Sequence, residues 1–173
     1  MTDRRDRLAR LNQDSGNVEW FTPPNLIGLA RQVLGQIDLD VASCEAANEV
    51  VRATRYFTRE DDGLSQDWFG NVFMNHPYGR DNRKWIAKLI SEFNWGYCDS
   101  AICVTWAATS EVWFRPLHSH AQCYLYGRQN FVPGKSGMKV SAPTKGICVT
   151  YLGTNRQAFA SAFGSLGAVK VPA

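Results

Sequence analysis

Short apolar segments alternate along this chain with segments whose apolar residues recur at helical spacing. Residues 72–74, 101–106 and 147–151 are continuous apolar runs, whereas residues 84–93 and 156–163 are amphipathic with a helical period. A short continuous apolar run is typical of a strand buried on both faces, and strands that alternate with helices form crossover connections. The alternation therefore predicts an α/β fold with a mostly parallel central sheet.

Further elements are expected on either side of these runs. Pro23 and Pro24 precede an apolar stripe and Gly35 follows it, which predicts a helix between them. Residues 56–70 have the composition of turns. We also expect strands at 37–41 and 122–126, helices at 45–52 and 109–117, and a long loop at 127–146.

The first residues differ from the rest in charge. Residues 1–16 carry four arginines without an apolar segment, which predicts a flexible basic arm and not a secretory signal. Residues 17–173 have a length that suits one domain with a hydrophobic core. No apolar run approaches the roughly 20 residues that span a bilayer. We therefore expect a cytoplasmic protein with no membrane contact.

The cysteines and histidines give no metal pattern. The five cysteines are odd in number, include no Cys-x-x-Cys pair and lie mostly in apolar runs, so we expect buried free thiols. His118 and His120 could bind a metal together, but an exposed helix end explains them at least as well. We expect no metal.

The tetrapeptide Asn75-His76-Pro77-Tyr78, called the NHPY loop below, follows the run at 72–74. Ligands of α/β sheets bind beyond the carboxyl ends of strands, so this loop and residues 41–44 are expected on one rim. The Asn75 amide oxygen and the carbonyl of residue 76 could accept both hydrogens of an exocyclic amine, while Pro77 stiffens the loop. Tyr78 could stack on a flipped base. The simpler alternative is a turn with Tyr78 packed on the core.

Basic residues are grouped although the net charge is only +3. One group follows the NHPY loop, and the other occupies a stretch rich in Gly, Pro and Ser that lacks acidic residues. Solvated surface explains either group alone, but their position beside a candidate site favours contacts with phosphates. The two groups are Arg80, Arg83 and Lys84, and Arg128, Lys135, Lys139 and Lys145.

Three other segments accompany the NHPY loop in order: Trp20-Phe21-Thr22-Pro23, Asp38-Leu39-Asp40-Val41-Ala42, and Asp62-Gly63-Leu64 followed by Trp68. With the loop, they resemble the phage-type DNA adenine-N6 methyltransferase family, and the similarity extends from about residue 20 to about residue 169. The resemblance implies a Rossmann-like S-adenosylmethionine-dependent methyltransferase fold without a separate target-recognition domain.

The resemblance also implies roles for residues. Double-stranded DNA would be the substrate, bound by loops at about 79–84 and 127–146 and by the basic arm, and adenine would be flipped out and methylated directly on N6. The catalytic residues would be Asn75, His76, Pro77 and Tyr78. In a phage, such a modification protects DNA against host restriction. The residues implied around the cofactor S-adenosylmethionine are Trp20, Thr22, Pro23, Asp40, Ala42, Asn48, Asp61 and Asp62.

The NHPY loop departs from the family pattern Asn-Pro-Pro-Tyr at one position. His76 replaces the first proline, so the carbonyl is kept while the restriction on φ is lost. Three alternatives to adenine N6 stay open: methylation of cytosine N4, a DNA-binding relative silenced by His76, and an RNA or small-molecule substrate. The sequence does not predict the oligomeric state or the recognition sequence.

Overall fold

The computed structural model describes residues 20–133 and 145–172. Within these residues, seven strands form one sheet in the order β3-β2-β4-β5-β8-β6-β9. Neighbouring strands are parallel from β3 to β5 and antiparallel from β5 to β9, so β8 and β9 oppose the other five. The predicted α/β class with a mostly parallel sheet is confirmed. The strands are β2 (Leu39–Asp40), β3 (Arg55–Tyr56), β4 (Gly70–Met74), β5 (Cys98–Trp106), β6 (Ala121–Leu125), β8 (Ile147–Leu152) and β9 (Gly167–Lys170).

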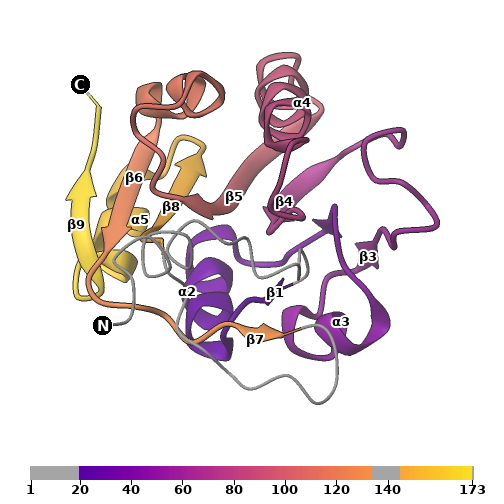
Figure 1. Ribbon diagram of the computed structural model, residues 1–173, viewed down its shortest axis with the longest axis horizontal. Coiled ribbons are helices and arrows are strands. Elements are labelled where there is room, and N and C mark those ends of the chain that lie inside the picture. Colours follow the sequence, from indigo (N-terminus) through magenta and orange to yellow (C-terminus); the bar gives the residue numbers. More distant parts are fainter. Residues whose placement is uncertain (1–19, 134–144, 173) are drawn as a thin grey trace, which may run out of the picture.

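Helices cover both faces of the sheet (Figure 1). The side chains of β4 alternate between the two faces, because successive residues of a strand point in opposite directions. Phe73 packs with the layer of α2 (Pro24–Leu34), α3 (Glu45–Val51) and α5 (Arg156–Phe163). Val72 and Met74 pack with the layer of α4 (Asn82–Asn94) and the 3-10 helix η1 (Val112–Ser119). The result is a three-layer Rossmann-like arrangement.

The direction of winding reverses between β2 and β4. The chain leaves β2 through α3 to reach β3 on one side, and it leaves β4 through α4 to reach β5 on the other. β2 and β4 are neighbours, with Asp40 paired to Phe73. In sheets of this kind, ligands bind beyond the carboxyl ends of the two strands at which the winding reverses. Residues 41–43 and the NHPY loop occupy these positions, as predicted.

Several elements match their predicted bounds and others differ. α5 has the predicted range, and α2 ends at Gly35, which has a φ of 75° and donates its N–H to the Arg31 carbonyl. The helix predicted at 109–117 is present with shifted bounds, but it is not an α-helix. The segment is the 3-10 helix η1 and contains Pro116, which has no N–H to donate to an α-helical hydrogen bond.

Four short strands were not predicted, two at the edges of the large sheet and two that form a separate sheet. β3 and β9 lie at the two edges of the large sheet, and β7 (Val132–Pro133) lies within the predicted loop at 127–146. β7 pairs with β1 (Trp20–Phe21) to form a separate two-stranded sheet. The basic arm at 1–16, together with Lys135 and Lys139, lies outside the described residues.

Candidate active site

Asn75 is the first residue after β4 and its amide has a defined orientation. Its Nδ2 donates to the Trp20 carbonyl over 2.5 Å. A carbonyl only accepts hydrogen bonds, so the amino group must face it and the amide oxygen must point away. That oxygen, Oδ1, is buried and has no hydrogen-bond partner among the described residues. The site therefore contains an acceptor oxygen that is available to a ligand.

His76 is buried beneath the loop. Its side chain is 1% exposed, and burial lowers the pKa of the imidazole to about 4, so the ring is neutral at pH 7. The ring makes edge contacts with Tyr78 at 5.7 Å and with Trp85 of α4 at 6.1 Å. A packed side chain thus supports the backbone at the position where the family pattern has a proline ring.

Tyr78 packs on the core, as the simpler alternative from the sequence had it. The side chain is 4% exposed, and its ring stacks on Trp106 at 4.9 Å with planes 12° apart. Burial raises the pKa of its hydroxyl, which has no partner within the described parts of the chain. Asn82, at the start of α4, accepts a hydrogen bond from the Gly79 N–H and so closes the turn after the loop.

Asp40 ends β2 and is 2% exposed. Burial raises the pKa of its carboxyl group to about 7, although the backbone N–H of Ala42 donates to it at 3.3 Å. Among the described residues, no ion pair involves this carboxyl group. A buried acid with a raised pKa at the end of a strand is a candidate for ligand binding.

An acidic turn, residues 61–63, touches the end of β2. A Cβ atom on Gly63 would lie 2.0 Å from the Val41 carbonyl oxygen, so only glycine permits this approach. Asp61 accepts hydrogen bonds from both the N–H and the hydroxyl of Thr58 at 2.8 Å, and the Thr58 backbone bond is the main reason that its pKa is lowered. The turn therefore places two exposed carboxylates beside the β2 end.

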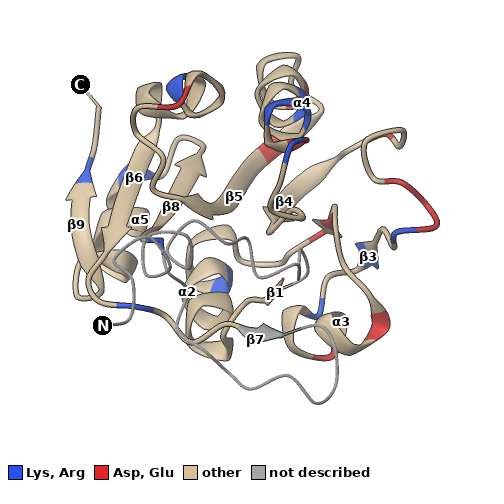
Figure 2. Cartoon of the chain, in the orientation of Figure 1, with Lys and Arg blue, Asp and Glu red and all other residues tan. Residues whose placement is uncertain are grey.

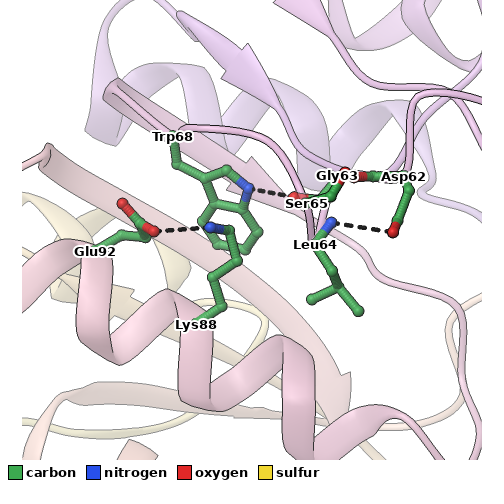
Figure 3. Close-up of polar contacts among 7 residues, drawn as sticks. All are labelled: Asp62, Gly63, Leu64, Ser65, Trp68, Lys88 and Glu92. Atoms are coloured by element: carbon green, nitrogen blue, oxygen red, sulfur yellow. Dashed lines mark hydrogen bonds and ion pairs between the residues drawn. The ribbon is translucent and has the colours of Figure 1, made fainter.

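Trp68 and α4 support this acidic turn (Figure 3). The Trp68 indole N–H donates to the Gly63 carbonyl at 2.7 Å. Lys88 lies 5.3 Å from the Trp68 ring and forms an ion pair with Glu92 at 2.8 Å. Trp85 stacks on Trp68 at 6.2 Å and also touches His76, so one helix supports both the turn and the NHPY loop. This role of Trp85 was not predicted from the sequence, where the only signal was the amphipathic spacing of α4.

The residues implied around the cofactor differ in how well they suit that role. Trp20 meets Asn75 through its carbonyl, and Thr22 and Pro23 follow β1 as buried residues. Asn48 has another role, because its amide bonds both the N–H and the carbonyl of Ala53 at the end of α3. The two bonds explain Asn48 structurally.

The predicted phosphate-binding residues that the structure describes are exposed, and those at the start of α4 have acidic neighbours. Arg80, Arg83 and Lys84 are exposed at the start of α4, where Lys84 pairs with Asp81 at 2.8 Å. Arg128 is exposed, and Lys145 lies over the Trp106 ring with Nζ 3.8 Å from its centroid. Figure 2 shows acidic residues in α3, in the segment between β3 and β4, and beside the basic residues at α4.

Comparison with known proteins decides the family. Residues 10–169 match the family described as DNA N-6-adenine-methyltransferase (Dam). This chain belongs to that family. The match covers nearly all of the chain and confirms the resemblance found in the sequence. At the level of the Dam family, the protein is a DNA adenine methyltransferase, and the family implies S-adenosylmethionine as the methyl donor.

No curated protein sequence matches the chain. Among solved structures, a Pyrococcus horikoshii protein described as an RNA methyltransferase shares 12% identity with it at a TM-score of 0.49, over 87% of this chain and 98% of the other. The fold assignment rests on the sheet topology and on the Dam family, and not on this likeness. None of the described helices is long and apolar enough to cross a membrane.

The polar groups of the site fit the cofactor that the Dam family implies. In the described residues, eight buried side-chain polar atoms lack a hydrogen-bond partner, and five of them belong to Thr22, Asn75, His76 and Tyr78. An unpaired buried polar group costs about 1–3 kcal/mol, and a ligand can supply the missing partner. Of these atoms, Thr22 Oγ1 and Asn75 Oδ1, together with the Asp40 carboxyl group and the acidic turn, are the polar groups that could meet a cofactor at the reversal of winding.

Proposed function

We propose that this protein transfers a methyl group to N6 of an adenine flipped out of double-stranded DNA. The observation that carries the proposal is the buried Asn75 Oδ1, which lacks a partner among the described residues and whose direction is set by the Trp20 carbonyl. The N6 lone pair is delocalised into the base and becomes more nucleophilic as the N–H groups are bound by acceptors. Asn75 Oδ1 and the His76 carbonyl would accept these two hydrogens and stabilise the positive charge that develops on nitrogen.

The cofactor would lie on the β2 side of the NHPY loop. When bound, S-adenosylmethionine supplies an electrophilic methyl group on a positively charged sulfur. The Asp40 carboxyl group, next to the end of β4, would accept from hydroxyl or amino groups of the cofactor. Thr22 Oγ1 would bind its methionine end, and Asp61 or Asp62 its adenine amine. Asn48 is the weakest of the expected contacts, since Ala53 already occupies its amide.

The duplex would approach over the start of α4. Arg80, Arg83 and Lys84 lie there, whereas the acidic turn and α3 would repel phosphates on the β2 side (Figure 2). Residues 17–173 would form one domain, and loops alone would contact the bases, so we expect short or limited sequence specificity. Protection of phage DNA from restriction is the biological role that fits this activity.

His76 favours an active enzyme over a silenced relative. Its neutral ring is fixed between Tyr78 and Trp85, so the carbonyl of residue 76 is supported by packing although no proline is present. A His76→Pro variant should accordingly keep methylation within a few-fold of the natural chain. A natural chain that does not methylate DNA, together with a His76→Pro variant that does, would contradict this view.

The proposal is tested by incubating the full chain with S-adenosylmethionine and unmodified duplex DNA, followed by mass spectrometry of the nucleosides. N6-methyl-2′-deoxyadenosine is the expected product. N4-methyl-2′-deoxycytidine would instead support the alternative target, which needs the same acceptors. Cofactor binding by calorimetry without any methylated nucleoside would overturn the proposal in favour of a non-catalytic DNA-binding protein.

A further inference from the structure

A cavity of about 350 Å³ lies beyond the carboxyl end of β5, on the side of the NHPY loop opposite to Asp40. This volume is at the low end of small-molecule sites, which span roughly 300–1,000 Å³, and suits a single base. Residues from the end of β5, the start of α4 and the segment before β8 line it. Trp106 and Lys145 are two of the lining residues.

The two faces of the Trp106 ring are covered by different side chains, Tyr78 and Lys145. Tyr78 stacks on it at 4.9 Å with nearly parallel planes, and Lys145 Nζ lies 3.8 Å from its ring centroid. An aromatic ring and an ammonium group cannot both fit on one face at these distances without overlapping. The Lys145 ammonium therefore covers the face opposite to Tyr78.

A base that displaces Lys145 from Trp106 would replace a weaker contact with a stronger one. A cation–π contact at an exposed site is a weak interaction, and Lys145 is exposed. Stacking of a base on an aromatic side chain is stronger. A base can thus replace the ammonium, and the displaced charge becomes available to a phosphate.

The position of Trp106 suits a base whose amine must reach Asn75. β4 and β5 are neighbours, and Met74 pairs with Cys103, so Asn75 comes level with Val104 and Trp106 ends β5 two residues further on. A spacing of about 4.8 Å between strands and an offset of about 6.6 Å along them separate the two backbones by roughly 8 Å, a gap that a purine between the side chains can span. Tyr78 cannot take this part in the present arrangement, because its side chain is only 4% exposed and Trp106 covers one face of its ring.

We propose that the Lys145-covered face of Trp106 is the stacking platform for the flipped adenine, and that Lys145 leaves this face to bind a DNA phosphate. Tyr78 is then a positioning residue that backs Trp106. This inference deepens the proposed function, on which it rests for the identity of the base.

The test compares the affinities of the full chain for two duplexes, one with a single unpaired adenine and one with an abasic residue at that place. An unpaired base is the easiest to flip, so the ratio of the two affinities measures binding of the base itself. Trp106→Leu should lower this ratio by roughly 5- to 100-fold, the equivalent of one lost stacking contact. Trp106→Phe, which keeps an aromatic ring, should retain most of it. Trp95→Ala, at a tryptophan that is 76% exposed after α4, is the matched control and should change nothing.

Lys145→Met separates the two parts of the proposal. It should leave the ratio unchanged or raise it a few-fold, while the slope of log Kd against log salt falls by about one for the lost phosphate contact. An unchanged ratio in Trp106→Leu, a natural chain that shows no preference for the unpaired adenine, or a loss of the ratio in Lys145→Met would each overturn the proposal. Nucleoside mass spectrometry on the natural chain tests the methylation separately, so a failure of that activity is distinguishable from a failure of the platform.

Discussion

The two sides of the NHPY loop differ in chemistry although they flank the same few residues. The side toward β2 has a buried acid, an acidic turn and the Thr22 hydroxyl group, which has no partner among the described residues. The side toward β5 has two stacked rings, an ammonium group and a cavity. A cofactor with a positive sulfur and many hydroxyl and amino groups suits the first side, and a flat base suits the second. Asn75 lies between them, so its free oxygen is where the two ligands would meet.

α4 connects the two sides. Trp85 touches His76 under the loop and Trp68 under the acidic turn, and Asn82 closes the turn that follows Tyr78. Changes within one side should therefore affect one ligand, and changes at the shared residues should affect methylation itself. The predictions below test this division.

Asn75→Ala should give the largest effect, because it removes the shared acceptor. Loss of one such hydrogen bond to a developing charge lowers turnover by about 100- to 1,000-fold. Affinity for S-adenosylhomocysteine, measured by calorimetry, should change little. Asn94→Ala, at an exposed asparagine that ends α4, is the control and should keep full activity. Methylation by Asn75→Ala at the natural rate would remove Asn75 from the mechanism.

The pH dependence of stability should reveal His76. Its pKa is about 4 in the folded protein and about 6.5 when unfolded, so the unfolded state binds more protons between these values. The contribution is complete above pH 6.5 and is lost as the pH falls to 4, by about 3 kcal/mol in total. Urea unfolding at several pH values should show a flatter profile for His76→Phe.

Asp40, on the β2 side of the loop, should change the stability with pH in the direction opposite to His76. Because its folded pKa is raised to about 7, the folded state binds more protons above pH 3.8, and stability falls as the pH rises toward 7. Asp40→Asn should remove this loss. An identical pH profile for the natural chain and both variants would contradict the burial of these two groups.

Gly63→Ala should weaken the β2 side selectively. The new Cβ would meet the Val41 carbonyl oxygen, a backbone atom that cannot move aside cheaply, so the acidic turn must shift. We expect a loss of stability of about 1–3 kcal/mol and weaker cofactor binding, with DNA affinity little changed. Gly28→Ala is the control, since a Cβ there meets nothing within 4 Å. Equal effects of the two substitutions on cofactor affinity would show that the turn does not position cofactor contacts.

Trp68→Phe should have the smallest effect. It keeps an aromatic ring near Lys88 and Trp85 but removes the N–H that bonds the Gly63 carbonyl. We expect a loss of about 1 kcal/mol in the free energy of unfolding, measured with urea. Cofactor affinity should fall with it, while preference for the unpaired adenine should persist. A selective loss of that preference would instead connect Trp68 with the β5 side.

The sequence predicted those elements that depend on interactions between residues close together in the chain. α5 was predicted to the residue because its apolar period is complete and Asn155 caps its first turn by accepting from Ala158. β3 and β7 could not be predicted, since a strand of two residues exists only through its partner in another segment. The same holds for the site. Asn75 was identified from its loop, but the covering of Tyr78 by Trp106 depends on a neighbouring strand.

The bond between the Asn75 amide and the Trp20 carbonyl has a consequence for how such a site tolerates sequence change. The group that orients the amide is part of the main chain, so every residue type at position 20 retains it. Mutational drift at that position can alter what surrounds the amide without turning it around. Only a displacement of the paired β1 and β7 segments would reverse which end of the side chain faces a substrate.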